Sequence, residues 1–462
     1  MRPLTPFHVA LFCIAFGLLE VPARSATVVP LLGKQPTHSA FDAQRKRKSV
    51  QVTTLYVFQG PPDAGHPNAT VTFDDHGSIF GVTSWGGPAG IGAVYRLTPA
   101  ASGYSETVLH SFAGGRDGSR PYYGLAAGKG GNLYGTASVG GNERCSGGCG
   151  VVFEVRRHPS SPNGYLERIL YRFVGGMDGS NPSSAPLIAA GTIYGTTQTG
   201  GGSTACSGGC GTVFKLTPTG HGYSESILYR FQGGSDGADP IAGLVADTDG
   251  ALYGTTLVGG GSPSCSGGCG TVFKLTPTSS GYSESVLYRF LGGSDGAILY
   301  SGVIVNRRGR VFGTTAWGGY GVGSLCDYNG VLTGCGTVFE LRPGHRKYHK
   351  TTLYEFTDAS DDGAGPWGGV TFGKNGTLYG TTLFGGNCGV AYYGCGTVYE
   401  LSPASGTYQF TLLYSFPGFA AAFPYAPVLF RNGVLYGTTA QGGVGSCDPT
   451  SYACGTVFEL TP

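Results

Sequence analysis

Short apolar runs separated by turn residues recur along most of the chain. In residues 252–277, the runs LYGTT and GTVFKLT flank a segment of Gly, Ser and Cys, which is typical of two strands joined by a loop. The same phrase returns throughout the chain, with its central aromatic at Phe80, Tyr134, Tyr194, Tyr253, Phe312, Tyr379 and Tyr436. A recurring period of this kind predicts an array of equivalent units rather than a set of unrelated domains.

Each repeat contains four strand-like runs, which are clearest in the fourth repeat at residues 241–247, 251–256, 270–276 and 282–290. In the second and fourth runs, apolar residues stand at both the odd and the even positions, as in strands that are covered on both faces. Four antiparallel strands in each of seven units predict an all-β fold, a seven-bladed β-propeller of four-stranded blades. A linear β-solenoid is the alternative, but it would leave both end runs unpaired.

The two ends of the array complement each other. The last repeat has only three runs, at residues 426–431, 434–439 and 455–460, and the missing fourth run stands before the first repeat at residues 52–58. We therefore expect the ring to be closed by pairing this N-terminal strand with the last blade, which removes exposed sheet edges.

Opposite charges suggest how the third and fourth runs pair. The charges lie ten residues apart in four repeats, at Arg96/Glu106, Lys215/Glu225, Lys274/Glu284 and, with the signs reversed, Glu340/Lys350. Facing positions of antiparallel strands favour opposite charges. The pattern predicts a hairpin in which these residues lie directly opposite each other.

The N-terminal residues are typical of an export signal. An apolar run at 7–19 follows Arg2 and precedes small residues, so we expect a signal peptide at 1–26, a polar linker at 27–50 and the propeller at 51–462. The linker holds the one basic cluster, RKRK at 45–48, which favours a solvated segment. No apolar run reaches the length of a spanning helix, so we expect no transmembrane segment in the mature chain and a secreted or periplasmic location.

Cysteine usage agrees with export. Apart from Cys13 in the signal, the cysteines fall in pairs, one pair in each of repeats two to seven, and each pair brackets the loop inside the repeated phrase. A zinc site would need two pairs in one place, so local disulfides are favoured. The expected pairs are Cys145/Cys149, Cys206/Cys210, Cys265/Cys269, Cys326/Cys335, Cys388/Cys395 and Cys447/Cys454.

The repeated phrases LYGTTxxGG and CGTVFxLTP, separated by FxGGxDG, resemble the tandem repeats of the GloVer proteins, which are named for Gloeobacter and Verrucomicrobia. The resemblance covers residues 51–462, and the first repeat diverges most because it lacks the cysteine pair. It implies an exported bacterial protein and supplies no catalytic residue. Members often carry C-terminal sorting anchors, whereas this sequence ends directly after its last repeat.

The net charge limits the kind of partner that the protein can bind. With 29 Lys and Arg against 27 Asp and Glu, the formal charge is only +2, which argues against a nucleic-acid partner.

Aromatic side chains interrupt the repeated sequence in the Cys-containing loops of repeats five, six and seven, in the corresponding loop of repeat one, and at the start of the first run of repeat six. Such side chains suit the faces of sugar rings. The expected ligand-binding residues are Trp85, Trp317, Tyr320, Tyr328, Trp367, Tyr392, Tyr393 and Tyr452, with Asp327, Asn329 and Asp448 as hydrogen-bonding neighbours. Mutual packing of these aromatics is the alternative.

Catalytic signals are faint. The recurring Asp of the FxGGxDG turn is typical turn chemistry, and Asp358, Asp361 and Asp362 form a weak calcium candidate. We expect no cofactor and a monomer.

The favoured hypothesis is an exported binding or scaffold module, with an extracellular glycan or cell-surface ligand as the partner. One alternative is a polysaccharide-degrading lyase or hydrolase that uses Asp361, Asp362, Asp327 or His66, and the other is a purely structural surface protein. Whether the protein is an enzyme stays open at this level.

Overall fold

The computed structural model describes residues 46–47, 50–321, 326–328, 332–357, 362–388, 394–418, 420–443 and 454–462, with the backbone alone for 46–47, 327–328 and 332–333. The chain divides into two compact units at residues 1–45 and 46–462. The predicted signal peptide lies outside the described residues, as does almost all of the predicted linker.

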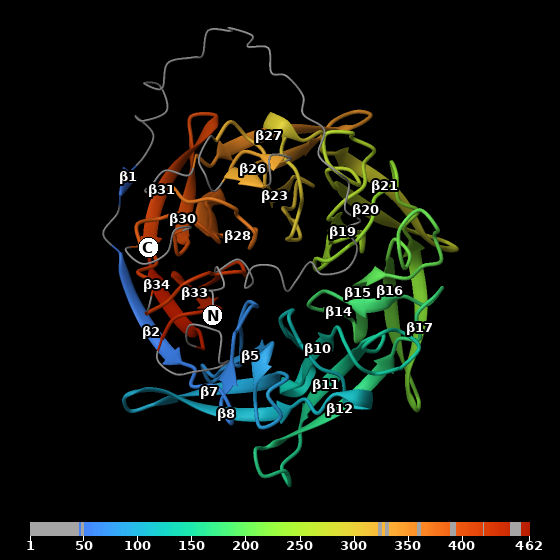
Figure 1. The fold of residues 1–462 in the computed structure, drawn as a ribbon, viewed down its shortest axis with the longest axis vertical. Coiled ribbons are helices and arrows are strands. Elements are labelled where there is room, and N and C mark those ends of the chain that lie inside the picture. Colours follow the sequence, from blue (N-terminus) through green and yellow to red (C-terminus); the bar gives the residue numbers. More distant parts are fainter. Residues whose placement is uncertain are drawn as a thin grey trace, which may run out of the picture. The chain divides into compact units, whose positions relative to one another are not determined.

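Residues 46–462 form the predicted seven-bladed β-propeller, whose blades follow one another around a ring in sequence order (Figure 1). Blade 1 comprises β4 (Thr72–Phe73), β5 (Ile79–Thr83), β7 (Ala93–Ala100) and β8 (Gly103–Ser111), and blade 2 comprises β9 (Ala126–Ala127), β10 (Leu133–Ala137), β11 (Val151–Arg157) and β12 (Tyr165–Arg172). Blade 3 comprises β14 (Leu187–Ala189), β15 (Thr192–Thr199), β16 (Thr212–Thr219) and β17 (Gly222–Arg230), and blade 4 comprises β18 (Val245–Ala246), β19 (Leu252–Thr256), β20 (Thr271–Thr278) and β21 (Gly281–Arg289). Blade 5 comprises β22 (Ile304–Val305), β23 (Val311–Thr315), β26 (Thr337–Pro343) and β27 (Tyr348–Glu355). Blade 6 comprises β28 (Val370–Phe372), β29 (Leu378–Thr382), β30 (Thr397–Ala404) and β31 (Thr407–Ser415). Blade 7 comprises β32 (Leu429–Arg431), β33 (Val434–Thr439), β34 (Thr456–Thr461) and β2 (Gln51–Val57).

Smaller elements decorate the blades. Two residues of the predicted linker form β1 (Lys46–Arg47), which pairs in parallel with β31 at the edge of blade 6. The remaining short strands are β3 (Ala64–Gly65) with β6 (Trp85–Gly86), β13 (Ser180–Pro182) on β15, and β24 (Asp327–Tyr328) with β25 (Leu332–Thr333); the 3-10 turns are η3 (Gly115–Asp117), η4 (Lys129–Gly131), η5 (Gly293–Asp295) and η7 (Lys374–Gly376). Among the described residues, no helix is long and apolar enough to cross a membrane.

The ring closes as the sequence predicts. Strand β2 pairs antiparallel with β34, from Gln51 opposite Thr461 to Val57 opposite Thr456 (Figure 1). The N-terminal strand therefore supplies the outer strand of the last blade, and the edge of β34 is covered.

An aromatic contact repeats at all seven blade interfaces. The Phe at the end of each outer strand packs edge-to-face on the central aromatic of the third strand in the next blade, as Phe231 does on Phe273 with ring centroids 5.1 Å apart. The same contact joins Phe58 to Tyr95 across the closure, at 5.0 Å. The second strand leaves room for this ring: a Cβ added to Gly254 would lie 2.5 Å from Cζ of Phe273. The repeated Gly in the LYGTT run is therefore a packing requirement.

The two threonines of the repeated phrase satisfy polar groups in the core. Thr255 donates its hydroxyl to the carbonyl oxygen of Ser301 in the next blade (2.8 Å), and Thr256 shares a hydrogen bond with Thr271 within its own blade (2.8 Å). Both side chains are buried, so these bonds offset the cost of removing the hydroxyls from water.

The third and fourth strands form the predicted hairpin, but the predicted facing of charges is wrong. Lys215 lies opposite Ser226, and Glu225 lies opposite Leu216. Adjacent residues on a strand point to opposite faces, so Lys215 and Glu225 lie on different sides of the sheet. The same one-residue offset separates Arg96 from Glu106, Lys274 from Glu284 and Glu340 from Lys350. These residues therefore face the neighbouring blades rather than each other.

Five of the six predicted disulfides are present, at Cys145–Cys149, Cys206–Cys210, Cys265–Cys269, Cys326–Cys335 and Cys388–Cys395. Cys454 is also disulfide-bonded, and its predicted partner Cys447 lies outside the described residues. Disulfides of this number are typical of proteins in oxidising, extracytoplasmic compartments.

Candidate functional site

Two loops of every blade lie side by side on one face of the propeller. We call the segment before the first strand the entry loop (231–244 in blade 4) and the segment between the second and third strands the Cys loop (257–270 in blade 4). Bridges join them, with Ala238 opposite Val258 in blade 4 and Ala364 opposite Phe384 in blade 6. In blade 1 the same pairing is made by β3 and β6. Loops held on a rigid scaffold are a common place for binding sites.

Every entry loop contains one residue in the left-handed backbone region at the same position. These residues are His66, Arg120, Asn181, Asp239, Ile298, Gly365 and Phe423, with φ between 53° and 62°. Only a few per cent of residues other than Gly adopt this conformation, and it is enriched at functional sites. Blades 1 to 4 place polar side chains at this position, whereas Ile298 and Phe423 are apolar.

The preceding blade holds this residue in place through its disulfide loop. The amide of Asp239 donates to the carbonyl oxygen of Cys210 (3.0 Å), and the amide of Ile298 donates to that of Cys269 (2.9 Å). The carbonyl oxygen of Asp239 in turn accepts from the amide of Leu257 in its own Cys loop (3.0 Å). Each disulfide thus fixes the acceptor that orients the entry loop of the next blade.

The residue after the left-handed position is Pro in six blades, and it packs on the preceding blade. A Cβ added to Gly211 would lie 2.5 Å from Cδ of Pro240, and Gly211 has φ of +93°. The Gly that follows the second Cys of the repeated phrase is therefore required both by the backbone and by this contact.

Two residues after the left-handed position, three successive blades place an aromatic side chain, and these side chains touch. Trp367 stacks on Tyr300 with centroids 4.2 Å and planes 26° apart, and it meets Tyr425 edge-on at 5.9 Å. Phe384 also meets Trp367 in an edge-to-face contact, with centroids 6.1 Å apart. All four are partly exposed. We call Tyr300, Trp367 and Tyr425 the aromatic rim.

The predicted site residues divide into several groups. Trp367 belongs to the aromatic rim, whereas Trp317 is only 7% exposed and packs with Cys265 and Cys269 in the core. Trp85 is partly exposed in β6, opposite Gly65, and Tyr320 is 76% exposed with its amide donating to Glu355 (3.2 Å). The side chain of Tyr328 and all of Tyr392, Tyr393 and Tyr452 lie outside what the structure describes.

Sequence reasoning missed Tyr300 and Tyr425 in the aromatic rim. A signal for the position was available, because Pro precedes an aromatic residue in Pro366-Trp367 and in Pro424-Tyr425 at the same place in the repeat. Tyr122 follows Pro121 in blade 2 and contacts Tyr123 at 6.4 Å, so this blade carries aromatics at the rim position too.

The carboxylates that the sequence suggested for catalysis or calcium binding differ in burial and in their hydrogen bonds. Asp362 is fully buried and accepts hydrogen bonds from the hydroxyl of Tyr354 (3.1 Å) and from the amide and hydroxyl of Thr357 (both 2.9 Å), so it organises its turn. Asp358, Asp361, Asn329, Asp448 and the side chain of Asp327 lie outside the described residues. By contrast, Asp239 at the left-handed position is partly exposed, and burial raises its pKa to about 6.

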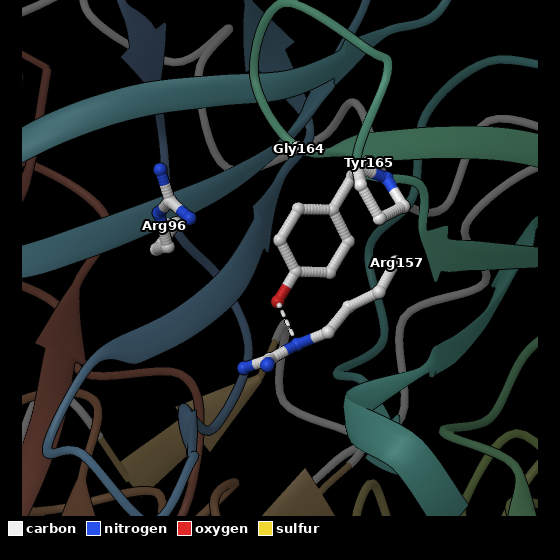
Figure 2. A pocket seen from close by; sticks show the side chains of 5 residues that line it. Arg96, Arg157, Gly164 and Tyr165 are labelled. Atoms are coloured by element: carbon white, nitrogen blue, oxygen red, sulfur yellow. Dashed lines mark hydrogen bonds between the residues drawn. The ribbon is translucent and has the colours of Figure 1, made fainter.

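Two further polar clusters lie away from the aromatic rim. A pocket of about 300 Å³ is lined by Arg96, Arg157, Pro159, Gly164 and Tyr165, and Arg157 Nε donates to the Tyr165 hydroxyl at 3.4 Å (Figure 2). Strand β11 begins after the Cys loop and ends at Arg157, so this pocket lies toward the opposite face.

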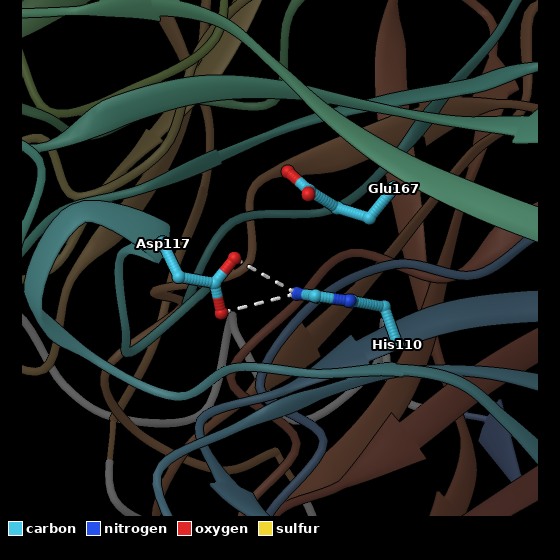
Figure 3. Close-up of side chains that lie close together, drawn as sticks. All are labelled: His110, Asp117 and Glu167. Atoms are coloured by element: carbon cyan, nitrogen blue, oxygen red, sulfur yellow. Dashed lines mark hydrogen bonds and ion pairs between the residues drawn. The ribbon is translucent and has the colours of Figure 1, made fainter.

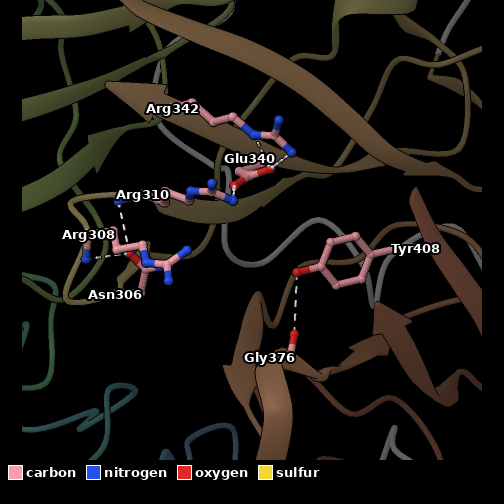
Figure 4. Close-up of polar contacts among 7 residues, drawn as sticks. All are labelled: Asn306, Arg308, Arg310, Glu340, Arg342, Gly376 and Tyr408. Carbon is pink, nitrogen blue, oxygen red and sulfur yellow. Dashed lines mark hydrogen bonds and ion pairs between the residues drawn. The ribbon is translucent and has the colours of Figure 1, made fainter. Parts of the chain in front are cut away.

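The second cluster surrounds the buried Glu340. Its carboxylate pairs with Arg310 Nη1 (3.1 Å) and Arg342 Nη2 (2.7 Å), while Tyr408 donates nearby to the carbonyl oxygen of Gly376 (3.3 Å) (Figure 4). Removal of either arginine would leave a buried charge with a single partner, so the arrangement is structural.

Similarities to solved structures concern the fold. The chain resembles a putative 6-phosphogluconolactonase from Bacteroides uniformis (14% identity, 78% of this chain and 88% of that chain, TM-score 0.46) and a polysaccharide lyase (12% identity, 88% and 97%, TM-score 0.49). It also resembles a PQQ-bound aldose sugar dehydrogenase from Streptomyces coelicolor (12% identity, 89% and 98%, TM-score 0.39). These likenesses carry no argument about ligands. No curated protein matches the sequence.

The repeat itself gives a family. The Gloeobacter/Verrucomicrobia repeat matches residues 40–161, 148–326 and 323–462, which together span the whole propeller. These matches agree with the blades, the closure and the disulfide-bonded loops described above, and the chain belongs to the Gloeobacter/Verrucomicrobia repeat family.

Proposed function

We propose that the protein is an exported carbohydrate-binding module whose site is the aromatic rim. The observation that carries this proposal is the stack of Trp367 on Tyr300, flanked by Tyr425, at one position of three successive blades. Flat, partly exposed rings of this kind match the apolar faces of sugars, and their edges are already supported by neighbouring rings. The stack therefore needs little reordering when a ligand binds.

The left-handed residues on the same face supply the polar contacts of the proposed site. His66, Arg120, Asn181 and Asp239 offer donors and acceptors on backbones whose amides are fixed by hydrogen bonds to the preceding blade. A ligand that contacts both the polar and the aromatic blades would be an oligosaccharide or a polysaccharide rather than a single sugar. We infer an extracytoplasmic glycan as the ligand class.

The test is binding of the mature protein to a panel of soluble glycans, followed by titration of each positive ligand. Trp367→Ala should weaken binding by at least about tenfold, by analogy with nucleobases, whose stacking on an aromatic side chain contributes on the order of 1–3 kcal/mol. Leu166→Ala, at an exposed position of the outer strand β12 (44% exposed), is the control and should bind like the wild type.

Two results would contradict the proposal: no glycan bound by the folded protein, or equal affinity of the Trp367→Ala variant. If Tyr320→Ala abolishes binding while Trp367→Ala does not, the ligand is held by the Cys loops instead. The far-ultraviolet circular dichroism of each variant checks that the propeller is intact.

Asp239 favours a second candidate, a lyase or hydrolase that cleaves polysaccharide at the same face. A carboxyl group with a pKa near 6 is suited to proton transfer near neutral pH. Incubation of each bound glycan with the protein, followed by measurement of new reducing ends, separates the two functions. An enzyme would release product and lose that activity in Asp239→Asn, whereas a binding module would release no product from any glycan that it binds.

A further inference from the structure

A repeated contact at the outer edge of the blades differs at one interface. The Asp of each FxGGxDG turn accepts a hydrogen bond from a backbone amide four residues before it and another from a ring seven residues before it. That ring is a tyrosine in blades 2 to 4, where Tyr171 donates to Asp178 (2.8 Å), Tyr229 to Asp236 (3.0 Å) and Tyr288 to Asp295 (2.8 Å).

In blade 1, His110 takes the place of the tyrosine. Its Nε2 lies 3.2 Å from Oδ1 and 3.3 Å from Oδ2 of Asp117, as Figure 3 shows. The imidazole packs edge-on against Phe112 with centroids 4.8 Å apart, which holds the ring in this orientation. A tyrosine hydroxyl can only donate to the aspartate here, whereas a neutral imidazole can offer a nitrogen lone pair.

The next blade supplies a third group to the same place. Glu167 of β12 points toward His110 and Asp117, and one ligand atom from each residue lies within 4.8 Å of the others (Figure 3). Oε1 of Glu167 is buried without a hydrogen-bond partner. Asp117 Oδ2 already accepts from the amide of Ala113 (2.7 Å), which leaves Oδ1 as the oxygen with free capacity.

We propose that His110, Asp117 and Glu167 bind a divalent transition-metal ion of the Zn²⁺ class between blades 1 and 2. Imidazole nitrogens and carboxylate oxygens are both ligand types of Zn²⁺, and three protein ligands leave the fourth position to water. An imidazole ligand disfavours calcium and magnesium, which prefer oxygen ligands alone. The ion would also satisfy the buried Oε1 of Glu167 and balance the charges of the two carboxylates.

The neighbouring positive charge is anchored to the backbone. Arg172 lies close enough to act electrostatically on Asp117, but its Nε donates to the carbonyl oxygen of Arg116 (3.0 Å). The equivalent Arg230 and Arg289 make the same kind of bond, to Met177 and Ser235, at interfaces where tyrosine replaces histidine. The histidine is thus what sets this interface apart.

Calorimetric titration of the untagged mature protein with ZnCl₂ at neutral pH tests the proposal. The wild type should bind one equivalent at this site, and His110→Tyr, which copies the residue of the neighbouring blades, should lose at least about tenfold in affinity because metal sites depend on each ligand and its support. Glu167→Gln should lose affinity in the same way. The visible absorption spectrum of the Co²⁺-loaded protein should disappear in both variants.

The repeat also permits a gain-of-site experiment. Tyr171→His should create a second equivalent with Asp178 and Glu225, since these residues occupy the corresponding positions at the next interface. The proposal is overturned if the folded wild type does not bind Zn²⁺, if His110→Tyr binds it unchanged, or if Ca²⁺ binds this site more tightly than Zn²⁺.

Discussion

Buried carboxyl groups at the blade interfaces show how single residues respond to their neighbours. Glu225 and Glu284 each have one carboxylate oxygen that is buried without a hydrogen-bond partner. Burial and, to a smaller extent, the turn carboxylates Asp178 and Asp236 raise the pKa of each to about 7, although Arg230 and Arg289 act in the opposite direction. The next interface replaces the glutamate by Lys350, which pairs with Asp295 at 3.1 Å.

This arrangement predicts that stability falls as the pH rises. A carboxyl group whose pKa is higher in the folded state than its usual 4.5 favours folding while it is protonated, and that contribution is lost as the pH rises through about 7. Each half-exposed glutamate should contribute on the order of 1 kcal/mol after allowance for solvent screening. Urea denaturation of the wild type at pH 5 and pH 8 should therefore show a larger free energy of unfolding at pH 5.

The double variant Glu225→Gln/Glu284→Gln should lose part of this difference, mainly by becoming more stable at pH 8. The rest should remain, because the pKa values of Glu106 and Glu167 are raised in the same way. Glu284→Lys, which copies Lys350, is a useful companion because its ion pair with Asp236 should reverse the sign at that interface. An unchanged pH dependence in the double variant would show that other groups cause it.

At the scale of elements, the unit of construction is the Cys loop of one blade together with the entry loop of the next. The disulfide holds the carbonyl oxygen of its second cysteine, which accepts from the left-handed residue across the interface. Blade 1 shows that this geometry also forms without a disulfide, since the carbonyl oxygen of Ile91 accepts from Arg120 at 3.0 Å.

We therefore expect Cys206→Ser/Cys210→Ser to fold but to be less stable. Opening this short loop should cost about 2 kcal/mol in the chain-entropy model. Hydrogen exchange should accelerate specifically at the amide of Asp239, which bonds to Cys210. Equal exchange rates in wild type and variant would mean that the disulfide does not support the entry loop.

How far the sequence predicts such elements depends on the kind of signal. The strands, the seven blades and five disulfides follow from the period, because a strand or cysteine pair that is uncertain in one repeat is confirmed at the same position of the others. The hairpin register did not follow, since the pairing of Thr219 with Gly222 across the turn sets Lys215 opposite Ser226 rather than Glu225. The aromatic rim was found only in part, because Tyr300 and Trp367 come together through the curvature of the ring, which no local pattern records.

At the scale of the whole molecule, stability depends on closure. β2 covers the edge of β34, and Phe58 extends the ring of aromatic contacts to Tyr95. The pairing of β2 with β34 joins segments about 400 residues apart in the sequence, so it forms only when all blades are in place.

Deletion of residues up to Phe58 should leave blade 7 with three strands and an exposed edge. We expect such a chain to self-associate through that edge and to unfold at a lower temperature than the complete propeller. Light scattering and thermal unfolding measure the two effects. A monomeric truncated chain with unchanged unfolding temperature would refute this role of β2.

The left-handed position of the entry loops has a consequence for evolution and design. Seven different amino acids occupy it, from Gly365 to Arg120 and Phe423, yet the backbone keeps the same conformation because its hydrogen bonds come from the main chain of the adjoining loops. At the six positions other than Gly365, where an added Cβ would lie 3.3 Å from Trp367 Nε1, the side chain can therefore be exchanged without redesigning the loop that carries it. The propeller offers six such positions on one face, which suits it as a scaffold for combinatorial libraries.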